Sequence, residues 1–111
     1  MSTRTEKISK LIQRELGEIF QLATRDFYRG TLITVTKVRV SADLSVSKVY
    51  ISIFPGNKLN EIIDAINSNK KYYRHKLAKR IKNQVKIIPE LAFFIDDSLD
   101  YIENIEKILN K

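Results

Sequence analysis

The chain of 111 residues has no cysteine and only one histidine, His75. Without cysteine there can be no disulfides and no thiolate-ligated metal sites. A single histidine also makes a zinc site improbable, because structural zinc sites take about four nitrogen or sulfur ligands. The usual catalytic groups of nucleophile, base and orienting residue need a histidine or cysteine that this sequence does not offer. We therefore expect no catalytic residue, no metal and no cofactor.

Long apolar runs are missing as well. The longest, Leu91 to Ile95, covers five residues, whereas a membrane-spanning helix needs about 20. The first residues are polar and lead directly into a helical pattern, which is not typical of a signal peptide. We expect a cytoplasmic protein with no membrane partner. The length and an apolar content of 43% predict a single globular domain over residues 1–111.

Acidic residues are absent from one stretch, residues 67–89. This stretch holds eight of the twenty lysines and arginines together with His75, whereas residues 90–111 contain six acidic residues. The whole chain has a formal net charge of +7. A block of positive charge kept free of carboxylates favours a polyanionic partner such as nucleic acid.

Apolar periodicity indicates seven elements. Residues repeat at three- and four-residue steps in the predicted helices and alternate in the predicted strands. Asn67-Ser68-Asn69 interrupts the central helical pattern, because asparagine and serine side chains compete for backbone groups. The elements are a helix over 3–24, strands over 32–40 and 46–54 joined by a turn at 41–44, a helix over 58–67, a helix that ends near Asn83, a strand over 91–96 and a last helix capped at Asp97-Ser98. This order predicts an α+β fold with an antiparallel hairpin and helices on one face of a three-stranded sheet.

The positive charge falls on one predicted helix. With Leu77 on its buried side, Lys71, His75, Lys79 and Lys82 gather on the opposite side, and we name these four residues the basic ridge. A solvated helix face is the alternative. However, such a face usually mixes both signs, and pairs of like charges cost about 0.2–0.5 kcal/mol each. The candidate RNA-binding residues are Lys70, Lys71, Arg74, His75, Lys79, Arg80, Lys82 and Lys86.

Further candidates lie beside the ridge and on the hairpin. Tyr72 should point outward, either to stack on a base or to pack against neighbouring side-chain stems, whereas Tyr73 is expected in the core. The basic and aromatic residues of the hairpin either extend an RNA surface or form an ordinary hydrated face. The secondary RNA-binding candidates are Lys37, Arg39, Lys48, Tyr50 and Tyr72.

Several local strings resemble a known family. Residues 34–38, 41–44 and 48–52 are similar to its hairpin signature, and the run Pro-Glu-Leu-x-Phe-x-x-Asp-x-Ser at 89–98 is similar to its third strand and exit. The chain resembles the ribosome-binding factor A family, which comprises bacterial ribosome-assembly factors built on a type II KH domain. The similarity extends over nearly the whole chain.

The resemblance implies a type II KH-like fold of order α-β-β-α-α-β with a C-terminal helix. It also implies a non-enzymatic role: binding the small ribosomal subunit (30S) and its rRNA, and assisting late maturation and rRNA 5′-end processing. The family is linked to growth in the cold. Ribosomal proteins or other assembly factors are further expected partners. With no heptad seam in the sequence, we expect a monomer.

The sequence departs from related domains at one junction. Ordinary KH domains place Gly-x-x-Gly between the paired helices so that the backbone can approach phosphates. That motif is absent here, as it is in this family, and Asn69-Lys70-Lys71 stands where the family usually has an Ala-x-Gly kink. Two other functions stay open: a basic module that binds an acidic protein, and a structured-RNA-binding protein not tied to the ribosome.

Overall fold

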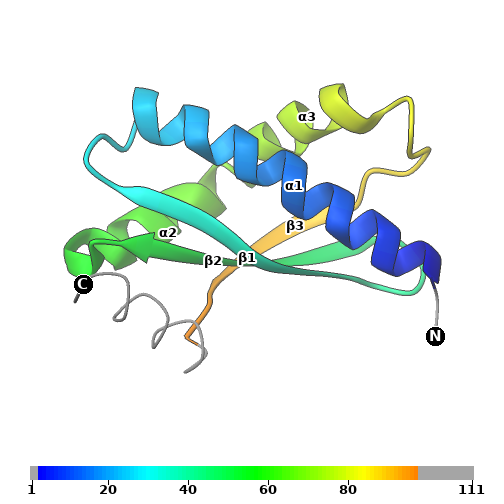
Figure 1. Ribbon diagram of the computed structural model, residues 1–111, viewed down its shortest axis with the longest axis horizontal. Coiled ribbons are helices and arrows are strands. Elements are labelled where there is room, and N and C mark those ends of the chain that lie inside the picture. The colour runs from blue at the N-terminus through cyan, green and yellow to red at the C-terminus, as the bar shows by residue number, and fades with distance from the viewer. Residues whose placement is uncertain (1–2, 98–111) are drawn as a thin grey trace, which may run out of the picture.

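Helices lie on one face of a three-stranded sheet in the computed structural model, which describes residues 3–97 (Figure 1). The elements are α1 (Thr3–Asp26), β1 (Leu32–Val40), β2 (Val46–Phe54), the short 3-10 helix η1 (Gly56–Lys58), α2 (Leu59–Ser68), α3 (Lys70–Ile81) and β3 (Glu90–Ile95). The predicted bounds of β1 and β2 are confirmed. In contrast, α3 ends at Ile81, before the predicted Asn83. The helix predicted after Asp97 lies outside the described residues.

The sheet has the order β1-β2-β3 and mixes two kinds of pairing. β1 and β2 form the predicted antiparallel hairpin, with Leu32 opposite Phe54. β3 runs parallel to β2, and a parallel connection needs a long crossover, which α2 and α3 provide. A register shift between Val35 and Lys37 interrupts the β1–β2 ladder. This irregularity explains why the sequence of β1 alternates only in part.

The hairpin turn is built around Asp43. Its carboxylate accepts hydrogen bonds from the hydroxyls of Ser45 and Ser41, each at 2.7 Å, and from the Ser45 backbone N–H at 3.1 Å. These bonds, led by the Ser45 hydroxyl, lower the pKa of Asp43 to about 2. Leu44 follows in the left-handed region with φ of 63°, and its side chain is buried in the core. The turn predicted at 41–44 is therefore confirmed.

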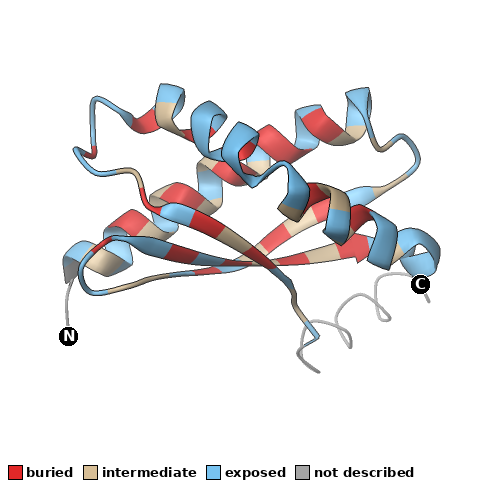
Figure 2. Ribbon diagram, turned by 180° about the vertical axis from the view of Figure 1, so that it is seen from behind, coloured by how far each residue is buried: buried red, intermediate tan, exposed pale blue. Residues whose placement is uncertain are grey.

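An aromatic cluster joins α1, α3 and β3 inside the core. The ring centroid of Tyr73 lies 4.9 Å from that of Phe20 and 5.9 Å from that of Phe93. Tyr73 is only 2% exposed, so its predicted core position is confirmed. Burial first, and then a hydrogen bond with Tyr28, raise the pKa of Tyr73 above its usual range. Buried residues line the sides of the helices that face the sheet (Figure 2).

Two asparagines shape the break between α2 and α3. Asn69 leaves the helical region with φ of −108° and ψ of 23°, and its Nδ2 donates to the Ala65 carbonyl at 2.8 Å. Asn67 turns the other way: its Nδ2 donates to the Phe93 carbonyl, and its Oδ1 accepts from the Phe93 N–H, both at 3.1 Å. The predicted interruption is confirmed, and side-chain amides at the break bond to α2 and to β3.

Candidate nucleic-acid interface

Packing of α3 against the sheet turns its charged side outward. Tyr73, Leu77 and Ile81 recur at four-residue steps and are buried. The charged side chains of α3 therefore lie on the side of the helix that faces away from the core. The predicted outward orientation of the basic ridge is confirmed, because its four residues are exposed. Lys70, Lys71, Arg74, His75, Lys79, Arg80, Lys82 and Lys86 are all exposed.

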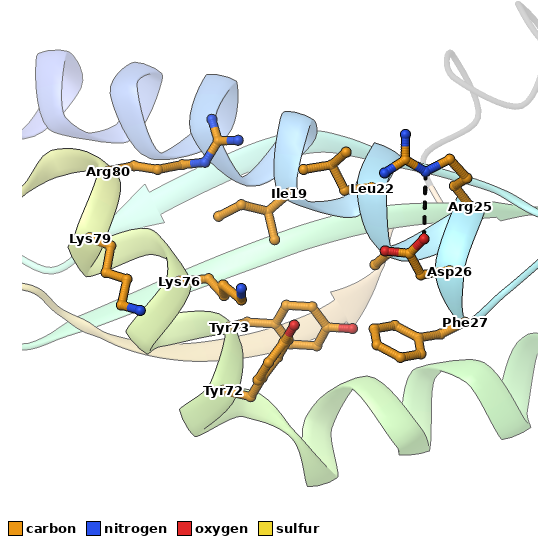
Figure 3. A pocket seen from close by; sticks show the side chains of 11 residues that line it. Ile19, Leu22, Arg25, Asp26, Phe27, Tyr72, Tyr73, Lys76, Lys79 and Arg80 are labelled. Atoms are coloured by element: carbon orange, nitrogen blue, oxygen red, sulfur yellow. Dashed lines mark ion pairs between the residues drawn. The ribbon is translucent and has the colours of Figure 1, made fainter.

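The exposed side of α3 borders two different cavities. Lys71 and His75 line one of about 500 Å³ beside the start of β3. Tyr72, Lys76 and Lys79, at steps of four and three residues, line another of about 290 Å³ beside the end of α1 (Figure 3). The two sides of the helix therefore present lysines in different surroundings. Lys76 was not among the sequence candidates, although its spacing from Tyr72 could have indicated it.

Arg74 has a structural contact in addition to its charge. Its Nε and Nη2 donate to the Ile88 carbonyl at 3.2 and 2.7 Å, and Nε also approaches the Pro89 carbonyl at 3.2 Å. These bonds hold the segment that enters β3 against α3. No carboxylate within the described residues neutralises the Arg74 guanidinium.

Arg80 belongs to the stretch without acidic residues, but the fold gives it carboxylate partners from another helix. Its Nη1 lies 3.3 Å from Glu15 Oε1 and 3.2 Å from Glu18 Oε2. Glu15 also accepts a hydrogen bond from Arg14, and this bond first, with Arg80 next, lowers the pKa of Glu15. The partners sit on α1, more than 60 positions away in the sequence. Arg80 is therefore a weaker candidate for phosphate than the lysines around it.

The lysines of this region carry uncompensated charge. Across residues 3–97, ion pairs to acidic side chains involve only arginines. In water such pairs are worth little, but a row of unpaired ammonium groups creates a field that attracts a polyanion. None of the lysines in residues 3–97 forms an ion pair with an acidic side chain of that range, and six of them are concentrated on and after α3: Lys70, Lys71, Lys76, Lys79, Lys82 and Lys86.

The hairpin candidates come together on the sheet face opposite the helices. Lys37 pairs with Tyr50, and Arg39 pairs with Lys48, across the β1–β2 ladder. The Lys37 ammonium lies 5.5 Å from the Tyr50 ring centroid. Phe94 of β3, 43% exposed, adds a second ring 5.7 Å from that of Tyr50. Sequence reasoning missed Phe94, although a strand that buries Phe93 must turn the next side chain outward.

Lys86 lies apart from the ridge, beside α1. A shallow groove there is lined by Arg4 and Lys7 together with Lys86, and its continuation by Lys10 and Arg14. In the sequence, acidic residues are interleaved with these α1 cations, so charge density alone does not single them out. Folding brings them beside the segment that follows α3, so the basic surface is broader than one helix.

The described part of the chain offers neither a membrane span nor a metal cluster. In residues 3–97 no helix is both long and apolar enough to cross a membrane. In the same range no three histidine, aspartate or glutamate side chains gather into a group that could hold a metal ion.

The sequence and the fold both match known proteins. The family model for ribosome-binding factor A matches residues 4–109. This chain belongs to the ribosome-binding factor A family. Family members from Christiangramia forsetii and Flavobacterium johnsoniae are 46% and 44% identical, over 96% and 97% of this chain and 82% and 84% of their own lengths. The resemblance inferred from the hairpin and the exit motif is confirmed.

Solved structures of ribosome-binding factor A share the fold. The crystal structure of the Thermus thermophilus protein has a TM-score of 0.67 at 27% identity, covering 82% of this chain and 94% of that chain. A homology model of a Thermus thermophilus ribosome-binding factor A, fitted into a cryo-EM map of a 30S complex, has a TM-score of 0.57 at 29% identity, covering 76% of this chain and 86% of that chain. The predicted type II KH-like α+β fold is confirmed.

Proposed function

We propose that this protein is a ribosome-assembly factor that binds the small ribosomal subunit by contacting phosphates of its rRNA. The observation that supports the proposal most is the set of lysines on and after α3, which form no ion pair within residues 3–97. The basic ridge makes the main contact. A homology model of the Thermus protein has been fitted into a cryo-EM map of a 30S complex, which supports the same partner here.

The mechanism is binding without bond making or breaking. A rigid α3, anchored in the core by Tyr73 and Leu77, presents positive charge that favours one arrangement of the rRNA over others. A ligand shifts such an equilibrium only by its difference in affinity for the two arrangements. Late maturation of the subunit and processing at the rRNA 5′ end are assisted in this way, by a monomer in the cytoplasm.

Phosphate contacts predict a specific dependence on salt. Each neutralised phosphate releases counterions, so the logarithm of the binding constant falls linearly with the logarithm of salt concentration. If about five phosphates are neutralised, the slope is roughly −3.5 to −4.5. Titration of purified 30S subunits with labelled protein over a range of salt concentrations measures this slope. A slope near zero contradicts the proposal.

A charge-reversal variant tests the surface. We expect Lys71→Glu/Lys79→Glu/Lys82→Glu to remain at the top of a sucrose gradient, whereas the wild type sediments with free small subunits. All three side chains are exposed, so the fold should persist, which circular dichroism checks. Wild-type binding that survives RNase digestion of the subunit would show that the partner is a protein instead.

The opposite sheet face offers a matched control. The variant Lys37→Glu/Arg39→Glu/Lys48→Glu makes the same change in net charge at three exposed positions. If location matters rather than total charge, this variant keeps more of its affinity than the ridge variant does. Equal loss in both variants contradicts a contact localised on α3.

A further inference from the structure

An aromatic cavity lies between the end of α1 and α3. We name it the aromatic hollow, and its volume is about 290 Å³. Its walls combine apolar and basic side chains that turn toward one another (Figure 3). Phe27 is 65% exposed and Tyr72 is 43% exposed. The residues that define it are Leu22, Phe27, Tyr72, Tyr73, Lys76 and Lys79.

The Tyr72 ring packs against a fixed neighbour before any ligand binds. The Tyr72 and Tyr73 rings form a T-shaped contact, with centroids 5.3 Å apart and planes at 81°. Tyr73 is in turn locked between Phe20 and Phe93 in the core. A ring fixed in this way loses little conformational freedom when another flat group stacks on it, and such preorganisation favours affinity.

Phe27 provides a second aromatic wall. It follows α1 directly, where its N–H donates to the Ala23 carbonyl at 2.7 Å, so the backbone that carries the ring is fixed. A neighbouring cavity of about 250 Å³ is also lined by Phe27, Tyr72 and Tyr73, and additionally by Tyr28. The free space therefore continues along the two exposed rings, because Phe27, Tyr72 and Tyr73 line both cavities.

The rim of the aromatic hollow is positive. The Lys76 ammonium lies 5.5 Å from the Tyr72 ring centroid, and Lys79 stands one turn further along α3. Among the described lining residues the acidic side chain is Asp26, and it pairs with Arg25 at 3.5 Å. A site that combines aromatic rings with lysines suits a ligand in which a flat ring adjoins an anionic group.

A nucleotide of single-stranded RNA has this chemistry. Bases stack on aromatic side chains, while lysines neutralise the adjoining phosphates. The volume is close to the lower limit of small-molecule sites, about 300 Å³, which suits one ring system. We propose that the aromatic hollow binds one unpaired RNA base, stacked on Tyr72, with its phosphates beside Lys76 and Lys79. This inference rests on the proposed function and adds a base-binding site to it.

A fluorescent base tests the proposal directly. The probe is an RNA hairpin whose loop carries one 2-aminopurine, and the reference is a blunt duplex with the same stem sequence. We expect wild-type protein to quench the loop fluorescence. Tyr72→Ala should weaken hairpin binding by about 5- to 150-fold, the range that corresponds to ~1–3 kcal/mol per stacked base. Its affinity for the duplex should change by less than about twofold, since a paired base cannot enter the site.

Two variants serve as controls for the aromatic face. Tyr72→Phe keeps the ring and should bind the hairpin within about twofold of the wild type. Phe54→Ala removes another exposed ring, which lies at the end of β2 and lines neither of the two aromatic cavities, and should leave hairpin binding unchanged. If Tyr72→Ala is poorly folded by thermal melting, Phe27→Ala replaces it, because that side chain protrudes into solvent from the opposite wall.

The outcomes separate this inference from the proposed function. Normal hairpin binding by Tyr72→Ala, together with loss of binding in the ridge charge-reversal variant, overturns the base site alone. Normal binding by both variants overturns the proposed function as well. Equal weakening on hairpin and duplex overturns the base site, because it shows no base dependence. If Tyr72→Ala binds 30S subunits more weakly but binds the hairpin normally, the hollow contacts a ribosomal protein, and this result also overturns the base site.

Discussion

Replacing Asn67 by alanine should loosen β3 from the helical layer. The Asn67 amide both donates to and accepts from the backbone of Phe93, at 3.1 Å each, on the side of β3 that has no strand neighbour among the described residues. Each hydrogen bond contributes about 1 kcal/mol net. Alanine is a better helix former than asparagine, and this difference offsets roughly 0.5 kcal/mol of the loss from the two hydrogen bonds. The expected net loss in the free energy of unfolding is therefore about 1–2 kcal/mol.

Two measurements check this loss at different levels. In urea, a loss of about 1.5 kcal/mol with an m-value near 1.5 kcal/mol per molar lowers the unfolding midpoint by about 1 M. Hydrogen exchange followed by NMR reports the local effect, because the Phe93 N–H loses its acceptor and should exchange faster. The matched control is Asn69→Ala, which removes a single exposed bond to Ala65 and should cost no more than about 0.5–1 kcal/mol.

Exchange of the Phe93 amide at the wild-type rate in Asn67→Ala would refute this role. The same conclusion follows if Asn69→Ala proves the more destabilising of the two. Either result would mean that the helix break, rather than its attachment to the strand edge, carries the energetic role of these amides.

Two other predictions concern charge. Arg80→Gln should reduce RNA affinity less than Lys79→Gln, because α1 carboxylates already neutralise Arg80, and salt-dependent RNA titrations of both variants show whether the order reverses. Asp43 has its pKa lowered to about 2 from 3.8, so its stabilising effect is complete above pH ~4 and disappears as pH falls toward 2. The difference in thermal midpoint between wild type and Asp43→Asn should therefore shrink over that pH range, and a constant difference would contradict the role of the ionised carboxylate.

Much of the fold could be predicted from local pattern. The strand bounds at 32–40 and 46–54, the turn at Asp43 and the break near Asn69 all depend on residues close together in sequence. The burial of Tyr73 and Leu77, and hence the outward direction of the ridge, follows from helical periodicity alone. The bulge near Lys37 was not predicted, because it depends on how one strand registers against another.

The candidate site was predicted only in part. The lysines of α3 were found because their charge density is visible in the sequence. The aromatic hollow was not, since Phe27 and Tyr72 are far apart in sequence and meet only when α1 and α3 pack together. The groove beside Lys86 was not predicted for the same reason, because only folding brings the first half of α1 beside this residue.

The sequence alone determined, to within about two residues, where each described helix and strand lies, as well as which side of each is apolar and where positive charge concentrates. These properties arise from side-chain spacing of three to four residues in helices and two in strands, and from turn residues that bond their own backbone. Tertiary structure decided which charges are paired, such as Arg80 with its partners on α1, and which remain unpaired. It also decided which exposed rings share a cavity. Such contacts join residues far apart in the sequence, and only the packing of helices on the sheet brings them within reach.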